Sequence, residues 1–138
     1  MTDKFTQDWL KAAWIDLDSV DKLLPFQHLT SVASFLCQQS IEKSFKAVFE
    51  YFKLDIIKTH NLLRLYSIVS SKITLSNINE KQLNKINDLY TDSRYPSEFG
   101  LLPDGKPSVE EAKEFYNFAL SIYEQVKKIL EQNSNIKP

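Results

Sequence analysis

The sequence contains very little cysteine, glycine or arginine. Among its 138 residues there is one cysteine, Cys37, and there are two glycines, Gly100 and Gly105. A single cysteine excludes an intramolecular disulfide and a zinc site built from several cysteines, and it suits a reducing compartment. Two glycines cannot form the glycine-rich loop that cradles phosphates in many nucleotide-binding proteins.

An excess of charge is also missing. The chain has 17 lysines and arginines against 18 acidic residues, which gives a net charge of −1. This balance provides no general attraction to nucleic acid or to anionic membranes, so a nucleic-acid site would have to be a local patch. No apolar run reaches the roughly 18 residues of a membrane span, and the N-terminal residues lack the apolar segment of a signal peptide. We therefore expect a cytoplasmic protein without a membrane partner.

Apolar residues recur with a helical period along nearly the whole chain, and no strict alternation indicates a strand. The pattern predicts helices over about 7–24, 30–53, 60–70 and 80–94, and a last helix that the capping box of Ser108 and Glu111 opens. Thr6 and Thr59 are the expected caps of the first and third helices. Residues 97–107 hold Pro103, Pro107 and Gly105 and should form a loop. We predict an all-α, antiparallel up-and-down bundle of four to five helices, a single domain over 1–138 with its core in about 7–130 and a frayed tail over 131–138.

Each predicted helix has an apolar stripe, and the second helix has the most apolar one. On the first helix, Ile15 points away from the stripe. On the second helix, Cys37 lies within the stripe and is expected to be an inert core residue. The N-terminal half of this helix is apolar nearly all round, which implies a central position or a partner chain. The first stripe comprises Trp9, Leu10, Ala13, Leu17, Val20 and Leu24, and the second comprises Ser34, Cys37, Ile41, Phe45, Val48 and Phe52.

Three features are candidates for function. Arg94 falls on the core-facing side of the fourth helix. Its role is either structural or functional: it satisfies the carbonyls at the helix end or pairs with Asp88 or Asp92, or else it binds a phosphate at a cleft covered by the loop over 99–102. Gln39, Lys43, Lys46 and Glu50 form a polar stripe on the second helix that is either a solvated face or part of a binding site. His60 either has a structural role, as a helix cap or in a hydrogen bond to a neighbour, or takes part in catalysis. Neither histidine follows a glutamate at the spacing of a metal site in a helical bundle, so no metal or cofactor is expected.

Four segments together resemble the HEPN domain. They are Asp8-Trp9-Leu10-Lys11-Ala12-Ala13, Cys37-Gln38-Gln39-Ser40-Ile41-Glu42-Lys43-Ser44-Phe45-Lys46-Ala47, Lys58-Thr59-His60-Asn61-Leu62 and Tyr90-Thr91-Asp92-Ser93-Arg94-Tyr95-Pro96. Each segment is weakly specific, but their order and spacing match from about residue 7 to 130. The resemblance implies a compact antiparallel helical bundle, a homodimer, and binding of a nucleotide or RNA. It also implies a minimal nucleotidyltransferase as partner, in a toxin–antitoxin-like pair.

HEPN ribonucleases that need no metal carry an arginine followed after four to six residues by a histidine. No histidine follows Arg94, and Arg64 comes after His60. The resemblance therefore implies ligand binding more than cleavage, with Arg94, Tyr95, Lys43, Lys46 and Asp92 as the candidate phosphate or nucleotide ligands. Two alternatives remain: an endoribonuclease that uses His60 with Arg94, and an interaction partner that binds no ligand.

Overall fold

The computed structural model describes residues 2–94, 106–132 and 136–137, and within α4 it describes side chains only up to Leu89. The described residues form five α-helices and one short 3₁₀ turn. In chain order these are α1 (Lys4–Leu23), η1 (Gln27–Leu29), α2 (Thr30–Tyr51), α3 (Leu62–Val69), α4 (Glu80–Arg94) and α5 (Val109–Gln132). The protein is an all-α helical bundle, as the periodicity predicts.

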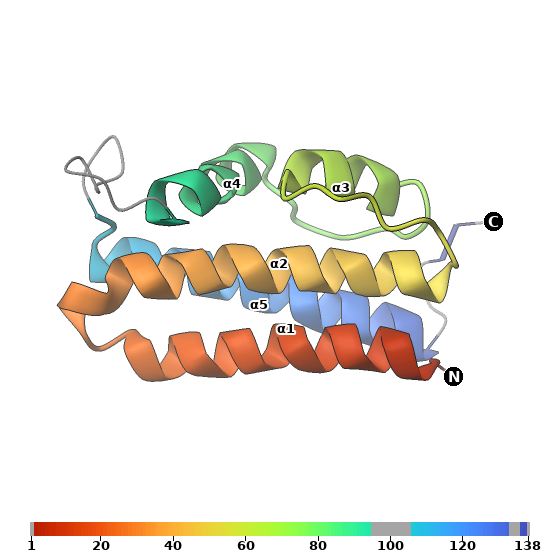
Figure 1. Ribbon diagram of the computed structural model, residues 1–138, viewed down its shortest axis with the longest axis horizontal. Coiled ribbons are helices and arrows are strands. Elements are labelled where there is room, and N and C mark those ends of the chain that lie inside the picture. Colours follow the sequence, from red (N-terminus) through yellow and green to blue (C-terminus); the bar gives the residue numbers. More distant parts are fainter. Residues whose placement is uncertain (1, 95–105, 133–135, 138) are drawn as a thin grey trace.

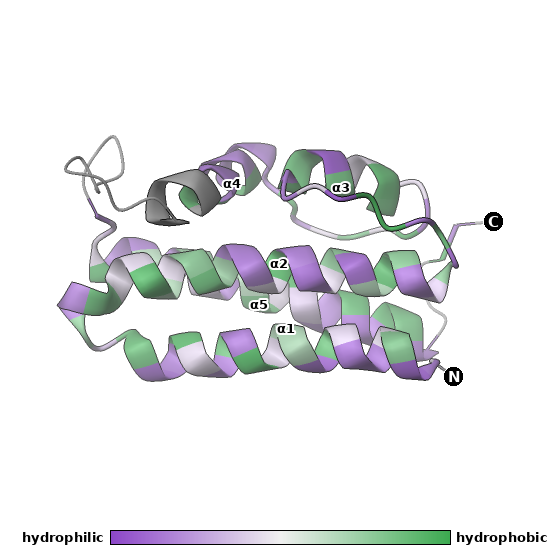
Figure 2. Ribbon diagram, viewed as in Figure 1, coloured by the Kyte–Doolittle hydropathy of each residue, from purple (hydrophilic) through white to green (hydrophobic). Residues whose placement is uncertain are grey.

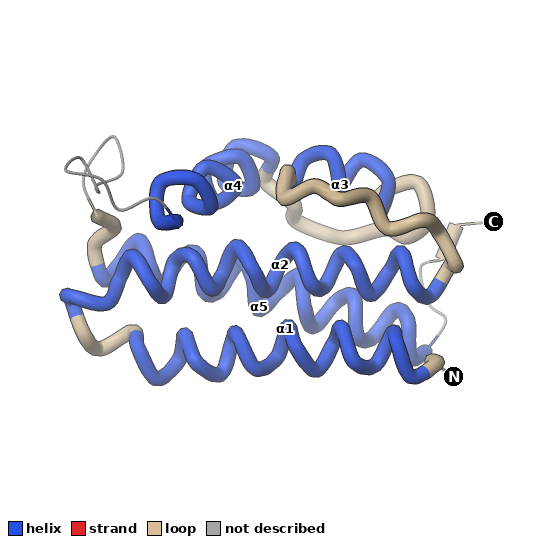
Figure 3. Tube along the Cα trace, viewed as in Figure 1, coloured by secondary structure: helices blue, strands red, loops and turns tan. Residues whose placement is uncertain are grey.

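The three long helices lie side by side, and the two short ones cover them. Figure 1 shows α1, α2 and α5 running along the length of the molecule, with α3 and α4 end to end above α2. The extended connection from α2 to α3 runs back over the bundle (Figure 3). α2 packs against α1, α3, α4 and α5, so it is the central helix. Among the helices described, none combines the length and apolar character that crossing a membrane requires.

Helix boundaries depend on capping side chains. α1 begins at Lys4, three residues before the expected start, because the Asp3 carboxylate accepts a hydrogen bond from the Thr6 backbone N–H at 2.8 Å. Thr6 as the cap was therefore wrong. α3 begins at Leu62 rather than directly after Thr59, because Asn61 is the cap: its Oδ1 accepts hydrogen bonds from the backbone N–H groups of Leu63 and Arg64.

The other boundaries agree closely with the sequence pattern. The capping box is confirmed: Ser108 Oγ accepts from the Glu111 N–H at 3.0 Å, and Glu111 Oε1 accepts from the Ser108 N–H at 3.2 Å. α4 occupies the predicted 80–94. α2 starts at the predicted residue 30 and ends at Tyr51, where Lys53 adopts a left-handed conformation with φ of 57°. The Leu54 N–H then donates to the Phe49 carbonyl, which closes the helix end.

The predicted stripes form one continuous core. The Cys37 side chain has no exposed surface, and burial raises the pKa of its thiol, which confirms it as an inert core residue. Ile15 points to solvent with 54% of its surface exposed, also as predicted. The largest fully buried apolar side chains are Leu17, Ile41, Phe45, Phe49, Leu62, Leu65, Ile73, Leu83, Ile86, Ile122 and Leu130.

The apolar first half of α2 is explained by its central position. Ala33, Ser34 and Cys37 are buried, Leu36 is half-buried and packs against the core, and Phe35 is half-buried. Val32 alone among the apolar residues of this half is exposed, with 49% of its surface accessible. The structure thus shows the central position that the pattern implies, and a partner chain stays a prediction.

The end of the chain is tied to the connection between α3 and α4. Ile136 forms an isolated antiparallel bridge with Ile73, and the Lys137 N–H donates to the Lys72 carbonyl at 2.9 Å. Ile136 is half-buried and packs against the core. Residues 136 and 137 are thus held by the bundle, in contrast to the frayed tail expected over 131–138.

Candidate functional site

The polar stripe of α2 is only partly exposed to solvent. Gln39, Lys43, Lys46 and Glu50 are all half-buried, and the neighbouring Gln38 and Glu42 are buried. Figure 2 shows hydrophilic segments along the middle of α2. Burying charged groups is costly unless they are paired, so each of them needs a partner inside the protein. Lys43 has its partner on α1, whereas Lys46 and Gln39 have theirs on α2 itself, at Glu42 and Gln38.

Lys43 is paired with Asp16 of α1. Its Nζ lies 2.8 Å from Asp16 Oδ2, and only 11% of the Asp16 side chain is exposed. Burial raises the pKa of Asp16, while the hydrogen bond and the charge of Lys43 oppose that rise. Close by, Ser40 Oγ donates to the Ala13 carbonyl at 3.2 Å. These contacts fasten the middle of α2 to α1.

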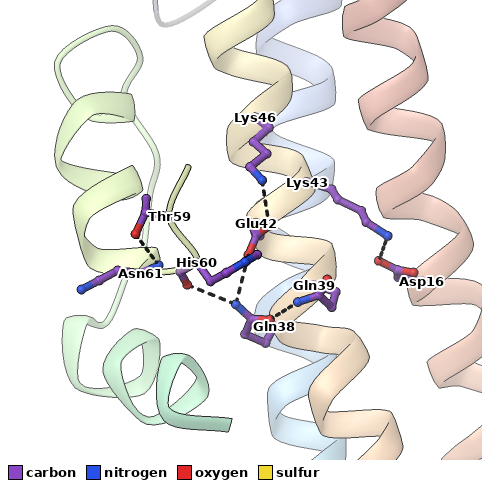
Figure 4. Close-up of polar contacts among 9 residues, drawn as sticks. All are labelled: Asp16, Gln38, Gln39, Glu42, Lys43, Lys46, Thr59, His60 and Asn61. Atoms are coloured by element: carbon purple, nitrogen blue, oxygen red, sulfur yellow. Dashed lines mark hydrogen bonds and ion pairs between the residues drawn. The ribbon is translucent and has the colours of Figure 1, made fainter. Parts of the chain in front are cut away.

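Glu42 is the centre of a second polar network. Only 5% of its side chain is exposed, and its two oxygens have different partners. Oε2 accepts from Lys46 Nζ at 2.9 Å, and Oε1 lies 2.9 Å from Nδ1 of the His60 imidazole (Figure 4). Lys46 Nζ also lies 5.4 Å from the centre of the Trp9 ring, a cation–π distance. A buried carboxylate thus holds one ammonium group and one imidazole.

Gln38 holds the backbone of His60 in place. Its Nε2 donates to the His60 carbonyl at 3.3 Å and lies 3.5 Å from Glu42 Oε1. The histidine is therefore fixed through its backbone and through its ring, while 49% of its side chain remains exposed. The Glu42 carboxylate faces Nδ1, so it can accept the hydrogen bond of the tautomer that carries its proton there. We call Gln38, Glu42, Lys46 and His60 the His60 network.

The segment that carries His60 is also attached to α4. The Leu62 N–H, directly after the cap Asn61, donates to Asn87 Oδ1 at 2.8 Å. The start of α3 therefore rests against the middle of α4. This contact fixes the distance between the His60 network and the helix that ends at Arg94.

The structure brings together three of the predicted site residues and leaves three undescribed. Lys43, Lys46 and His60 lie on or against the same part of α2. Arg94 is the last residue of α4, but its side chain and that of Asp92 are outside the described part of the chain, as is the whole of Tyr95. The predicted loop over 97–107 is described only from residue 106 onward.

Glu42, Gln38 and Asp16 are the residues that sequence reasoning missed. A signal for two of them was present: Gln38, Glu42 and Lys46 are spaced four residues apart, so they lie on one face of a helix, with the acidic group on the N-terminal side of the basic one. Asp16 and His60 carry no such signal, because their partners are 27 and 18 residues away in the sequence.

The comparisons with known proteins identify the fold. The family model of the HEPN domain matches residues 6–129, nearly the whole chain. The chain belongs to the HEPN family. Its structure is similar to the crystal structure of an archaeal HEPN homologue, with a TM-score of 0.66 and 25% sequence identity, over 91% of this chain and 97% of that chain. No curated protein matches the chain. The resemblance read from the four sequence segments is therefore confirmed, and the His60 network joins two of those segments.

Proposed function

We propose that this HEPN protein binds the phosphate of a nucleotide or of RNA beside the His60 network, where α2, the connection to α3 and α4 meet. The observation that carries the proposal is the His60 imidazole, half-exposed and held by a buried carboxylate. Glu42 holds the ring at Nδ1 and Gln38 holds the carbonyl of the same residue, so the ring has a fixed direction. A fixed imidazole next to a helix that ends in arginine is suited to an anionic ligand.

The register of α4 supports the involvement of Arg94. Asn87, which contacts the backbone just after His60, and Arg94 are seven residues apart. Seven residues are close to two helical turns, so both positions fall on the same face of α4, about 10 Å apart along the axis. An arginine at this distance is within reach of a ligand of nucleotide size that also contacts His60. Tyr95 and Asp92 remain predicted neighbours of that ligand.

The charges of Glu42 and Lys46 do not oppose an anion beside His60. The carboxylate of Glu42 is compensated by the ammonium group of Lys46, so it leaves no net negative charge next to the imidazole. Lys43 is compensated by Asp16 in the same way. A phosphate that contacts Lys43 or Lys46 directly would have to compete with the carboxylates of Asp16 and Glu42. We therefore propose that Arg94 and His60 make the main contacts with the phosphate.

The proposal includes the partner that the family resemblance implies. A HEPN module that binds a nucleotide would act together with a minimal nucleotidyltransferase, as half of a toxin–antitoxin-like pair. Co-expression of the two proteins followed by affinity capture tests this part. Capture of the nucleotidyltransferase by the wild-type chain supports it, and failure of the two proteins to co-purify contradicts it.

One specific observation favours a second candidate function, cleavage of RNA. The 2.9 Å contact between Glu42 Oε1 and His60 Nδ1 is the arrangement in which a carboxylate orients a histidine for proton transfer. Incubating labelled RNA with the wild-type protein and with His60→Ala tests the idea. Cleavage by the wild type and not by the variant would support it, and intact RNA in both samples would reject it.

Binding itself is tested by isothermal titration of the full chain with ATP, GTP and a short RNA. Arg94→Ala is expected to weaken binding about 10- to 100-fold, the usual cost of losing a charged hydrogen bond to phosphate. Arg64→Ala is the matched control, because Arg64 is the other arginine and lies exposed on α3. Absence of binding by the wild type, or equal binding by the Arg94 and Arg64 variants, contradicts the proposal.

A further inference from the structure

A groove of about 710 Å³ lies between α1 and α5. Its apolar part is lined by Trp14 of α1 and by Tyr116, Leu120 and Tyr123 of α5, and we call it the aromatic groove. A volume of this size is usual for sites that bind small molecules. None of the described residues that line the groove belongs to the His60 network. A ligand in this groove would therefore bind independently of a phosphate beside His60.

The positions of the rings follow from the helices that carry them. Trp14 is three residues before the buried Leu17, so it lies about 60° round α1 from that residue, at the edge of the core. The Trp14 indole is 44% exposed, and its centre lies 5.8 Å from the ring of the nearly buried Tyr123. Tyr116 is half-buried on the same side of α5, two helical turns or about 10 Å before Tyr123. The groove thus has an aromatic wall with an open indole surface.

The open indole surface is suited to a cation. The face of an aromatic ring is electron-rich and attracts cations, and tryptophan does so most strongly. Elsewhere in the protein, lysine ammonium groups lie 5.4 to 5.9 Å from three ring centres: Lys46 over Trp9, Lys72 over Phe52 and Lys85 over Phe115. No lysine in the described part of the chain covers the Trp14 ring in this way. The cation that this ring attracts would have to come from a ligand.

The electrostatic surroundings of the two tyrosines also favour a cation. Burial raises the pKa of Tyr116, and nearby carboxylates, with Asp21 the strongest of them, raise it further. Burial likewise raises the pKa of Tyr123, and the carboxylates of Glu131 and Glu124 add to this rise. Because these charges all act in the same direction, the potential at both hydroxyl groups is negative.

The two lysines of the groove do not neutralise this potential. Lys127 and Lys128 line its outer part with exposed side chains, opposed by Asp21, Glu124 and Glu131. Among the described residues, none of these five forms an ion pair. Three carboxylates and two ammonium groups leave one net negative charge around the aromatic groove.

We propose that the aromatic groove binds a small organic molecule through its quaternary ammonium group, with the cation against the Trp14 indole and the rest of the molecule along Leu120 and Tyr116. A primary ammonium group would lose hydrogen bonds to water that aromatic walls cannot replace. A quaternary ammonium group has no N–H to leave unpaired, and it keeps the full attraction of the rings.

Titration of the full chain with choline, at constant ionic strength, tests the proposal by nuclear magnetic resonance. The protein has two tryptophans, so the indole N–H signals provide an internal control. The Trp14 signal should move and reach saturation, whereas the signal of Trp9, whose ring Lys46 already covers, should not move. The uncharged analogue of choline, in which carbon replaces the quaternary nitrogen, should bind about tenfold more weakly. Ethanolamine, the primary amine with the same skeleton, should also bind more weakly than choline.

Two substitutions separate the ring from the charge. Trp14→Leu keeps an apolar side chain but removes the aromatic face, and it should weaken choline binding about tenfold, measured from the backbone amide signals of α5. Glu124→Lys, at an exposed position, should weaken binding about two- to fivefold. Asp55→Lys is the matched control, because it makes the same change of charge at an exposed position between α2 and α3, and it should leave the affinity unchanged.

Four results would overturn the proposal. They are the absence of a saturable shift, equal affinity for choline and its carbon analogue, tighter binding of ethanolamine than of choline, and full affinity in Trp14→Leu. Equal effects of Glu124→Lys and Asp55→Lys would likewise contradict a local role of the carboxylates. None of these results depends on whether ATP, GTP or RNA binds beside His60.

Discussion

Replacement of Glu42 by glutamine tests the central polar network most directly. The variant keeps the shape of the side chain but removes the negative charge that pairs with Lys46 and faces the His60 ring. Both members of the Glu42–Lys46 ion pair are largely buried, with 5% and 13% of their side chains exposed. Glu42→Gln therefore leaves an ammonium group at a buried position without its counter-charge.

The magnitude follows from the degree of burial. Removing one partner of a fully buried ion pair typically costs about 3–5 kcal/mol. Lys46 can move its ammonium group outward along its flexible chain, and the Trp9 ring beside it retains some attraction for the cation. We therefore expect Glu42→Gln to lower the free energy of unfolding by about 2–3 kcal/mol.

Urea unfolding followed by circular dichroism measures this loss. For a small domain, 2–3 kcal/mol moves the unfolding midpoint by about 1 M urea or more. Lys85→Gln is the control, because it breaks the Lys85–Glu111 ion pair of 3.2 Å in which both side chains are exposed, and it should change the midpoint little. Lys46→Gln and the double variant complete a double-mutant cycle, in which the two losses should not add.

The reasoning would be refuted by a small or an additive effect. If Glu42→Gln and Lys85→Gln shift the midpoint equally, the buried ion pair of Glu42 contributes no more to the free energy of unfolding than an exposed ion pair does. If the effects of Glu42→Gln and Lys46→Gln simply add, the 2.9 Å contact between the two groups carries no coupling. Either result would remove the physical basis for treating the His60 network as a preorganised site.

Three further predictions concern the backbone, acid stability and a helix cap. Asn77 has a φ of 59°, in the left-handed region, which is unfavourable for alanine but not for glycine. Asn77→Ala should therefore destabilise the fold by about 1 kcal/mol in urea unfolding, whereas Asn77→Gly should not. Equal effects of the two substitutions would contradict this reasoning. Hydrogen bonds from Lys53 and from Thr6 lower the pKa of Asp3 from 3.8 to about 2. Its stabilising effect should thus be present above about pH 4 and be lost as the pH falls toward 2, and Asp3→Asn should abolish this part of the pH dependence of the unfolding free energy. Ser108→Ala removes the cap of α5 and should cost about 1 kcal/mol in thermal unfolding; an unchanged melting temperature would show that the capping box is not needed.

The sequence was sufficient to predict the helices because their signals are local. Apolar periodicity placed α2 and α4 within two residues of their observed ends, and the capping box located the start of α5. The start of α1 was missed because two residues, Asp3 and Thr6, are both reasonable caps by type, and only the folded backbone shows which one accepts the hydrogen bond.

The candidate site was only partly predictable because its contacts are not local. The polar stripe of α2 was found, but its burial was not, since Lys43 and Lys46 on a helix are typical of a solvated face. Their carboxylate partners are distributed over α1 and α2, and His60 arrives from another segment. The pattern of one helix cannot show which of its polar residues a neighbouring segment will cover.

The bridge between Ile73 and Ile136 has a mechanical consequence for the cover formed by α3 and α4. The residues that follow α5 are fastened to the link between these two short helices, and the start of α3 is fastened to α4 through Asn87. The first contact ties the cover to the residues that follow α5, and the second joins its two helices, so we expect α3 and α4 to move as one unit. Displacement of this unit from α2 would have to break the bridge between Ile73 and Ile136.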